Sequence, residues 1–107
     1  MLLAVLGLAS LASWAAIHSP ARGQGPPIPL ECRVAGRPWQ ACQMEISDPG
    51  RRWDLVVGQR RYTFQHDGTG HMRMAVDGRW REVTPRWNSD GSLCWDGLCA
   101  RGDIPLD

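Results

Sequence analysis

The sequence lacks helical periodicity beyond its N-terminal segment. After that segment, no window of ten or more residues has its apolar side chains at helical spacing, and no repeat longer than a hairpin occurs. These absences exclude a helical domain and a chain of alternating strands and helices. The net charge is only +1, which argues against a general nucleic-acid binder. Lysine is absent altogether, so arginine is the only strongly basic side chain.

Motifs for catalysis, cofactors or metals are also missing. Cys94 and Cys99 enclose four residues rather than the two of a Cys-x-x-Cys redox motif. The same spacing recurs in His66 and His71 and fits no standard zinc pattern, so we interpret these histidines as exposed turn residues. The serines lie in turn segments without a nucleophile elbow or a base at a defined spacing. We therefore expect a protein that is not an enzyme and that holds neither a metal nor a cofactor.

The N-terminal segment predicts export. Residues 2–11 are almost wholly apolar and small residues follow up to Ala16, which is the layout of a secretory signal peptide. We expect residues 1–16 to form an apolar helix that is removed by cleavage. No arginine precedes the apolar run, so an uncleaved membrane anchor is the alternative, although residues 2–17 fall short of the roughly 20 residues that span a bilayer. Residues 17–29 are rich in proline and glycine and predict an extended linker.

From residue 30 onward, apolar and polar residues alternate, and Gly, Pro, Asn or Asp interrupts the pattern about every eight to twelve residues. This pattern is typical of an antiparallel β protein. Trp80 and Val83 are both apolar but three residues apart, and a β-bulge near residues 81–82 would bring them to one face. We predict that residues 30–107 form one all-β domain, an antiparallel meander curled into a partial barrel or a small sandwich.

The four cysteines form two pairs that are close in the sequence. An Asp-Gly pair between Cys94 and Cys99 predicts a type I′ turn, which places the two cysteines opposite each other with Cα atoms about 4.5 Å apart. That distance is within reach of a disulfide. Cys32 and Cys42 flank a bend at residues 36–38 and fit a hairpin of their own. We predict the disulfides Cys32–Cys42 and Cys94–Cys99, and with them an oxidising compartment, the periplasm or the cell exterior.

Two tryptophans do not fit the alternation of apolar and polar residues. Trp39 and Trp87 lie beside prolines and turns, with Arg37 and Arg86 close in the sequence. An exposed tryptophan near an arginine suits stacking on a sugar ring or contact with a protein. These four residues are our predicted binding surface. The alternative is that the tryptophans cover sheet edges or close the core.

Two short segments resemble a group of known proteins. Residues 32–38, which close at Cys42, and residues 78–83 resemble small exported proteins of marine picocyanobacteria and related bacteria, a group of uncharacterised activity. Those proteins have a Cys…Gly-x-Pro…Cys hairpin and a later Trp-x-Arg-Glu-Val strand, whereas here Arg81 follows Trp80 directly. The resemblance implies export and a β-rich domain, and it implies no activity.

These features favour a non-catalytic binding module or envelope-associated module. Its partner would be a protein or a carbohydrate, and it would contact a membrane only through the N-terminal segment. One alternative is an inhibitor that presents a rigid disulfide loop to a partner enzyme. Another is a small redox protein that uses Cys94 and Cys99.

Overall fold

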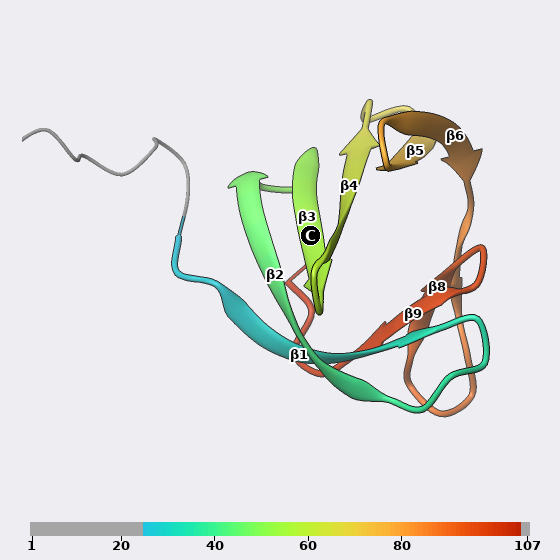
Figure 1. Ribbon diagram of the computed structural model, residues 1–107. Coiled ribbons are helices and arrows are strands. Elements are labelled where there is room, and N and C mark those ends of the chain that lie inside the picture. Colours follow the sequence, from blue (N-terminus) through green and yellow to red (C-terminus); the bar gives the residue numbers. More distant parts are fainter. Residues whose placement is uncertain (1–24, 106–107) are drawn as a thin grey trace, which may run out of the picture.

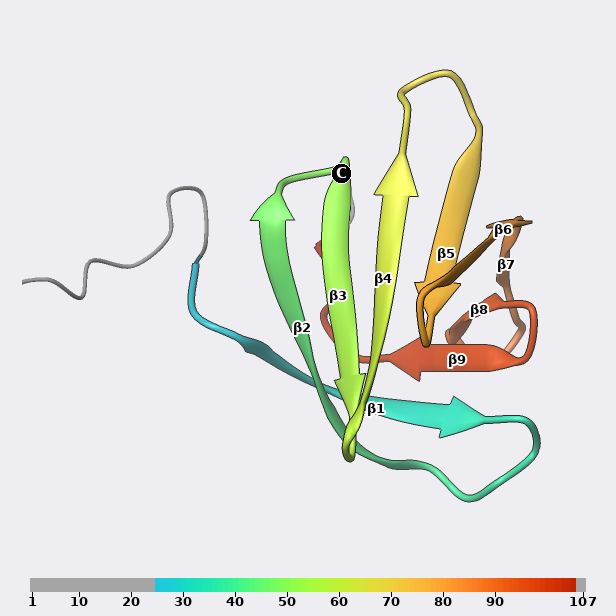
Figure 2. The same cartoon turned by 45° about the horizontal axis from the view of Figure 1, so that its top comes forward.

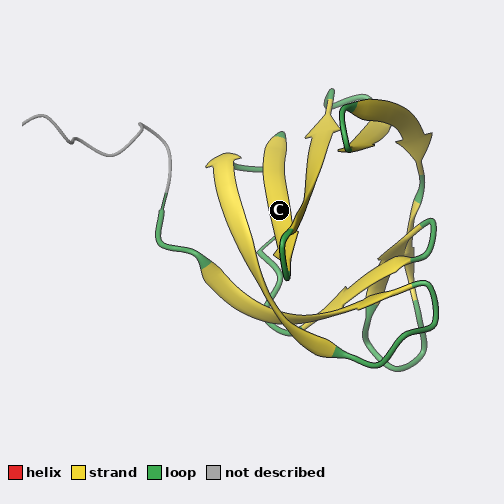
Figure 3. Ribbon diagram, in the orientation of Figure 1, coloured by secondary structure: helices red, strands yellow, loops and turns green. Residues whose placement is uncertain are grey.

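Nine β-strands make up the part of the chain that the structure describes, residues 25–105 (Figure 1 and Figure 3). The structure is a computed structural model. The predicted signal peptide with its apolar helix lies outside the described residues, as does most of the predicted linker. Within the described range, no helix is long and apolar enough to cross a membrane. The strands are β1 (Ile28–Val34), β2 (Gln40–Asp48), β3 (Arg52–Val57), β4 (Arg60–His66), β5 (Met72–Val76), β6 (Arg79–Val83), β7 (Pro85–Trp87), β8 (Leu93–Trp95) and β9 (Leu98–Arg101).

The strands form one antiparallel sheet that curls into a nearly closed barrel (Figure 1 and Figure 2). Neighbours follow the order β6-β5-β4-β3-β2-β1-β9-β8-β7, so most strands pair with the strand next to them in the chain. The pairing of β1 with β9 joins the two ends of this meander. β6 and β7 are separated only by Thr84 and bend from β5 toward β8 without pairing with each other. The predicted all-β antiparallel fold is confirmed, and its form is the barrel rather than the sandwich.

The Asp-Gly pairs at residues 77–78 and 96–97 form two-residue turns in which each residue has a positive φ, as a type I′ turn requires. The register around the second of these turns places Cys94 opposite Cys99, as predicted. The connection from β1 to β2 begins in the same way, with Ala35 at a φ of 48° and Gly36 at 81°. Alanine is poorly suited to this left-handed conformation because of its Cβ atom.

The inner face of the sheet is filled by apolar side chains centred on Phe64. The Phe64 ring stacks on Trp53 at a centroid distance of 5.4 Å and contacts Trp95 at 4.7 Å in a tilted arrangement. All three residues are buried, and their large apolar area is a main source of stability in so small a domain. Around them pack Leu30, Cys32, Cys42, Met44, Leu55, Val57, Tyr62, Met72, Met74, Val83, Leu93, Leu98 and Ala100.

Both predicted disulfides are present, and they lie on opposite faces of the sheet. Cys94 and Cys99 are directly opposed on β8 and β9, with Cα atoms 4.0 Å apart, on the outer face. Cys32 and Cys42 form a diagonal pair, since Cys32 is in register with Gln40, and they lie inside the barrel with Cα atoms 5.7 Å apart. Two disulfides are typical of a protein that folds in an oxidising environment.

The course of β6 differs from the prediction. The strand pairs with β5 without interruption, so the predicted bulge is wrong: Val83 faces the core, whereas Trp80 faces outward and is 40% exposed. Arg73 explains how an exposed indole is accommodated, because its guanidinium lies 4.9 Å from the centre of the Trp80 ring. The register shift of the sheet lies in β2 instead, between Ile46 and Asp48.

The start of the sheet also differs from the predicted boundary. β1 begins at Ile28, so Ile28 and Pro29 belong to the sheet rather than to the linker. Pro29 is tolerated because β1 has only β2 as a neighbour at this point, and pairing with β9 begins at Glu31.

Candidate functional site

A cavity lined by aromatic and apolar side chains lies where β7 and β8 approach the ends of β3 and β4. Its volume is about 280 Å³. Trp53 and Trp95 are buried members of its wall, while Trp87 is 67% exposed. We call it the aromatic cavity, and eight residues line it: Gly50, Trp53, His66, Met72, Pro85, Trp87, Leu93 and Trp95.

Two of the tryptophans that line the aromatic cavity have hydrogen-bond donors without partners. The indole N–H groups of Trp53 and Trp95 are buried and find no acceptor among the described residues. An unpaired buried donor costs about 1–3 kcal/mol. Most buried polar groups in proteins are paired, so these two donors are exceptions within the core.

A second hollow, which we call the polar groove, adjoins the aromatic cavity and shares His66 with it. Its volume is about 580 Å³. Three arginines, three carboxylates and two histidines line its walls, so it is far more polar than the aromatic cavity. The polar groove is lined by Asp48, Arg51, Arg52, Gln65, His66, Asp67, His71, Arg73 and Glu82.

The loop between β4 and β5, which borders the polar groove, is held by Asp67. Its carboxylate accepts hydrogen bonds from the Thr69 N–H at 2.8 Å, the Thr69 hydroxyl at 2.7 Å and the His71 N–H at 3.3 Å. The hydrogen bond from the Thr69 N–H is the largest cause that lowers the pKa of Asp67 from 3.8 to about 2. Asp67 is therefore ionised at neutral pH, with its charge directed to donors of its own loop.

His66 and His71 flank this loop in different surroundings. His66 is half-buried between the aromatic cavity and the polar groove. His71 is exposed, as expected, and its Nδ1 atom lies 3.8 Å from a carboxylate oxygen of Glu82. Within residues 25–105, no three His, Cys, Asp or Glu side chains gather as a set of metal ligands.

Of the predicted binding surface, Trp87 and Arg86 lie on β7 and face opposite sides of the sheet. Trp87 is in register with the buried Leu93, and both line the aromatic cavity. Arg86 is in register with Cys94, whose disulfide lies on the outer face. Of these two residues, only Trp87 reaches the aromatic cavity.

The other two residues of the predicted binding surface, Trp39 and Arg37, lie in the connection between β1 and β2. The guanidinium groups of Arg101 and Arg33 lie 4.1 Å and 5.0 Å from the centre of the Trp39 ring. Trp39 is thus half-buried, and part of its surface is already occupied by these cation–π contacts. Arg37 is exposed and lines neither the aromatic cavity nor the polar groove. The structure therefore does not bring the four predicted residues together in one site.

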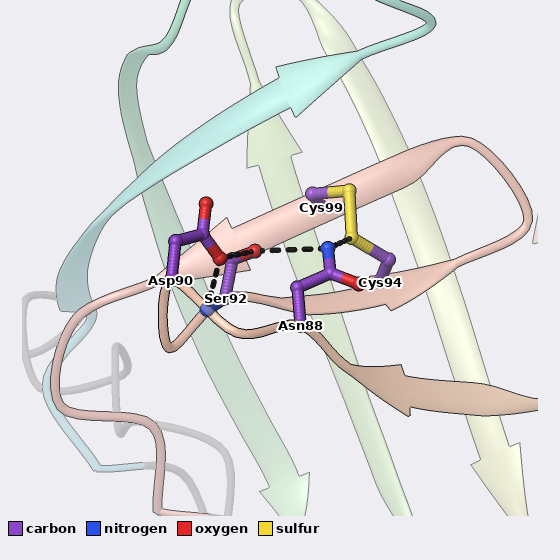
Figure 4. The surroundings of a disulfide bond; sticks show 5 residues. All are labelled: Asn88, Asp90, Ser92, Cys94 and Cys99. Atoms are coloured by element: carbon purple, nitrogen blue, oxygen red, sulfur yellow. Dashed lines mark hydrogen bonds between the residues drawn. A yellow bond between two sulfur atoms is a disulfide. The ribbon is translucent and has the colours of Figure 1, made fainter.

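The outer disulfide is surrounded by a hydrogen-bonded network (Figure 4). Asn88 Nδ2 donates to the Ser92 hydroxyl at 3.1 Å and lies 2.9 Å from Cys94 Sγ. Ser92 donates its hydroxyl and its N–H to one carboxylate oxygen of Asp90, at 2.6 Å and 3.0 Å. These two hydrogen bonds, the one from the hydroxyl first, lower the pKa of Asp90. The network fixes the turn between β7 and β8, and the disulfide joins β8 to β9 beside it.

The aromatic cavity itself was not foreseen from the sequence. Alternation places Trp53 on an inner face, but the cavity arises where β3 meets β7 and β8, which are distant in the chain. The only sequence signal for it is the high number of tryptophans, which exceeds what a small core can be expected to hold. No protein-family model, no curated protein and no solved structure matches this chain.

Proposed function

We propose that the protein is an exported, non-catalytic binding domain that takes a flat apolar ring of a small ligand into the aromatic cavity. The observation that carries this proposal is the cavity wall, in which Trp53, Trp87 and Trp95 come together. Aromatic walls with a few polar groups are typical of small-ligand sites. A ring bound there would stack on tryptophan.

The volume of the aromatic cavity limits the size of the group that it can hold. About 280 Å³ lies just below the range for ligand sites, roughly 300–1,000 Å³. The cavity is therefore suited to a ring system and not to an extended chain. The rest of a larger ligand would lie outside it, past the exposed Trp87.

Export to the periplasm or the cell exterior is part of the proposal. The two disulfides support it, because stable disulfides are rare in proteins of the cytoplasm. The signal-like residues 1–16 and the resemblance to exported bacterial proteins support it as well. A binding domain of this kind would meet its ligand outside the cytoplasm.

The test is a fluorescence titration of the oxidised protein with N-phenyl-1-naphthylamine, an uncharged aromatic probe. We expect saturable binding of one probe per chain. Replacing the exposed Trp87 by alanine should weaken binding at least about tenfold, since a well-placed aromatic contact contributes more than 1 kcal/mol. Trp80→Ala is the matched control, because Trp80 is also an exposed strand tryptophan but lies on the outer face. Absence of saturable binding, or equal losses in the two variants, would overturn the proposal.

A further inference from the structure

We propose that the outer disulfide, Cys94–Cys99, is a reversible thiol–disulfide exchange site that accepts two electrons from a dithiol. The site lies on the outer face of the sheet, so it is distinct from the aromatic cavity and goes beyond the proposed function. Disulfides of this kind differ from structural ones in two respects: a thiol can reach them, and their surroundings stabilise the thiolates that reduction creates.

An attacking thiol can reach the outer disulfide at Cys94. Cys94 is half-buried, whereas Cys99 is buried. Cys94 also borders a hollow of about 470 Å³, whose other lining residues are Glu82, Val83, Thr84, Arg86, Asp96 and Gly97. The inner disulfide differs in this respect, because both Cys32 and Cys42 are buried in the core cluster.

The outer disulfide lies between two arginines in one row of the sheet. Arg86 of β7 is in register with Cys94, and Arg33 of β1 is in register with Cys99. Directly opposed side chains lie on one face of a sheet, with Cβ atoms about 4.5–5.5 Å apart. Arg33 lies over the Trp39 ring, 5.0 Å from its centre, and among the described residues neither arginine takes part in an ion pair. Two positive charges beside the sulfur atoms favour the thiolate form of reduced cysteine.

Asn88 adds an uncharged donor to these two arginines. Its Nδ2 atom lies 2.9 Å from Cys94 Sγ, on the outer face of the sheet (Figure 4). A hydrogen bond to an ionised acceptor is roughly twice as strong as one to a neutral acceptor. The contact therefore stabilises a Cys94 thiolate more than it stabilises the sulfur of the intact disulfide.

Two carboxylates line the same hollow, and each has a basic neighbour of its own. Asp96 forms an ion pair with Arg81 at 3.2 Å. Glu82 lies 3.8 Å from His71 Nδ1 and belongs to β6, which pairs with neither β7 nor β8. Arg86 is the lining residue that is directly opposed to the disulfide. The charge in register with the sulfur atoms is therefore positive.

Reduction transfers two electrons from the dithiol to the disulfide. One thiolate of the dithiol attacks Cys94 Sγ, the S–S bond breaks, and Cys99 Sγ leaves as a thiolate that can take up a proton. The second thiolate then attacks the dithiol's own sulfur in the mixed disulfide, which closes the dithiol to a disulfide and releases Cys94 as a thiolate. The two protons lost by the dithiol balance those that Cys94 and Cys99 take up. The pairing of β8 with β9 keeps the two thiols opposed, so the bond can form again.

Equilibration of the oxidised protein with mixtures of reduced and oxidised dithiothreitol tests the inference. Alkylation followed by peptide mass spectrometry measures each disulfide separately. We expect Cys94–Cys99 to be half-reduced at a ratio of reduced to oxidised reagent at least about 100-fold lower than Cys32–Cys42, as exchangeable and structural disulfides differ. The protein reduced only at the outer bond should keep its folded tryptophan fluorescence, and oxidised dithiothreitol should restore the bond.

Three double variants test the role of the arginines. Arg33→Gln with Arg86→Gln should raise the ratio needed for reduction of the outer bond about tenfold at about pH 8, because the thiolates lose two nearby positive charges. Arg33→Lys with Arg86→Lys keeps both charges and should keep the wild-type ratio. The matched control, Arg52→Gln with Arg60→Gln, changes exposed arginines on β3 and β4, which pair with neither β8 nor β9, and should also keep it.

Reduction of both disulfides at the same ratio would overturn the inference, as would unfolding of the barrel when only the outer bond is reduced. Equal effects of the two glutamine variants would overturn it too. A lysine variant that changes as much as its glutamine counterpart would also overturn it, since altered packing and not charge would then explain the change.

Discussion

Replacing both cysteines of one disulfide by alanine will destabilise the barrel, and the inner disulfide will matter more than the outer one. In the chain-entropy treatment, a crosslink stabilises the folded state by an amount that grows with the logarithm of the loop length. The sequence separation is 10 for Cys32–Cys42 and 5 for Cys94–Cys99. These loops correspond to about 3 and about 2 kcal/mol near 25 °C.

The surroundings of the two disulfides increase this difference. Cys32 and Cys42 are 0% and 5% exposed and belong to the core cluster, so alanine there removes buried sulfur atoms and leaves unfilled space. That loss adds about 1 kcal/mol or more to the entropic effect. The outer disulfide lies on the other face of the sheet; Cys99 is buried there, but Cys94 is only half-buried and neither residue belongs to the core cluster. We expect a total loss of about 4 kcal/mol for the inner double variant and about 2 kcal/mol for the outer one.

Calorimetry of the wild type and the two disulfide variants, all under oxidising conditions, compares the losses of stability caused by removing each disulfide. For a domain of this size, 1 kcal/mol shifts the Tm by about 4–8 °C, so the outer variant should melt about 8–16 °C below the wild type. The inner variant should show about twice that shift. The reasoning would be refuted if the Tm of the outer variant fell as far as that of the inner variant. It would also be refuted if either variant kept the wild-type Tm.

Three further substitutions test local parts of the structure. Ala35→Asn places a residue suited to a φ of 48° in its turn and should raise the free energy of unfolding by about 0.5–1 kcal/mol in urea denaturation, whereas Ala41→Asn on an exposed strand position should not. The pKa of Asp67 is lowered from 3.8 to about 2, so its contribution to stability is present above about pH 4 and is lost as the pH falls toward 2. The Tm of the wild type should therefore fall more steeply over this range than that of Asp67→Asn, and parallel curves would contradict the assignment. Ser92→Ala removes a buried hydroxyl donor and should cost about 1 kcal/mol, with a rise in the pKa of Asp90 that NMR titration detects; an unchanged pKa would show that the hydrogen bonds of Ser92 do not hold this carboxylate.

Local signals in the sequence predict much of the fold. The alternation of residues places Trp53 and Leu55 on the inner face, because successive side chains of a strand point to opposite sides. The Asp-Gly turn predicts that Cys94 stands opposite Cys99, because the type of a tight turn determines the register of the strands beside it. Both predictions depend only on residues within a few positions of each other, and both are confirmed.

Features that join distant parts of the chain could not be predicted in this way. The pairing of β1 with β9 closes the barrel, and no local pattern records it. The aromatic cavity exists only after this closure, when β7 carries Trp87 next to Trp53 and Trp95. Alternation alone places Trp80 and Val83 on opposite faces, as observed, and the bulge was predicted only because both residues are apolar. The contact between Trp80 and Arg73 of the neighbouring strand, which accommodates the outward indole, could not be read from a local pattern. The four residues of the predicted binding surface do not form one site, because residues that are close in the sequence do not necessarily lie on the same face of the sheet.

The occupancy of the aromatic cavity by a ligand ring is tested most directly by the NMR signals of the indole N–H groups, assigned through single substitutions to phenylalanine. A titration with N-phenyl-1-naphthylamine should leave unchanged the signals of Trp39 and Trp80, the two tryptophans within residues 25–105 that lie outside the cavity. The same titration should shift, in a saturable manner, the signals of Trp53, Trp87 and Trp95. Shifts confined to Trp39 or Trp80, or no saturable shift in any tryptophan, would contradict binding in the aromatic cavity.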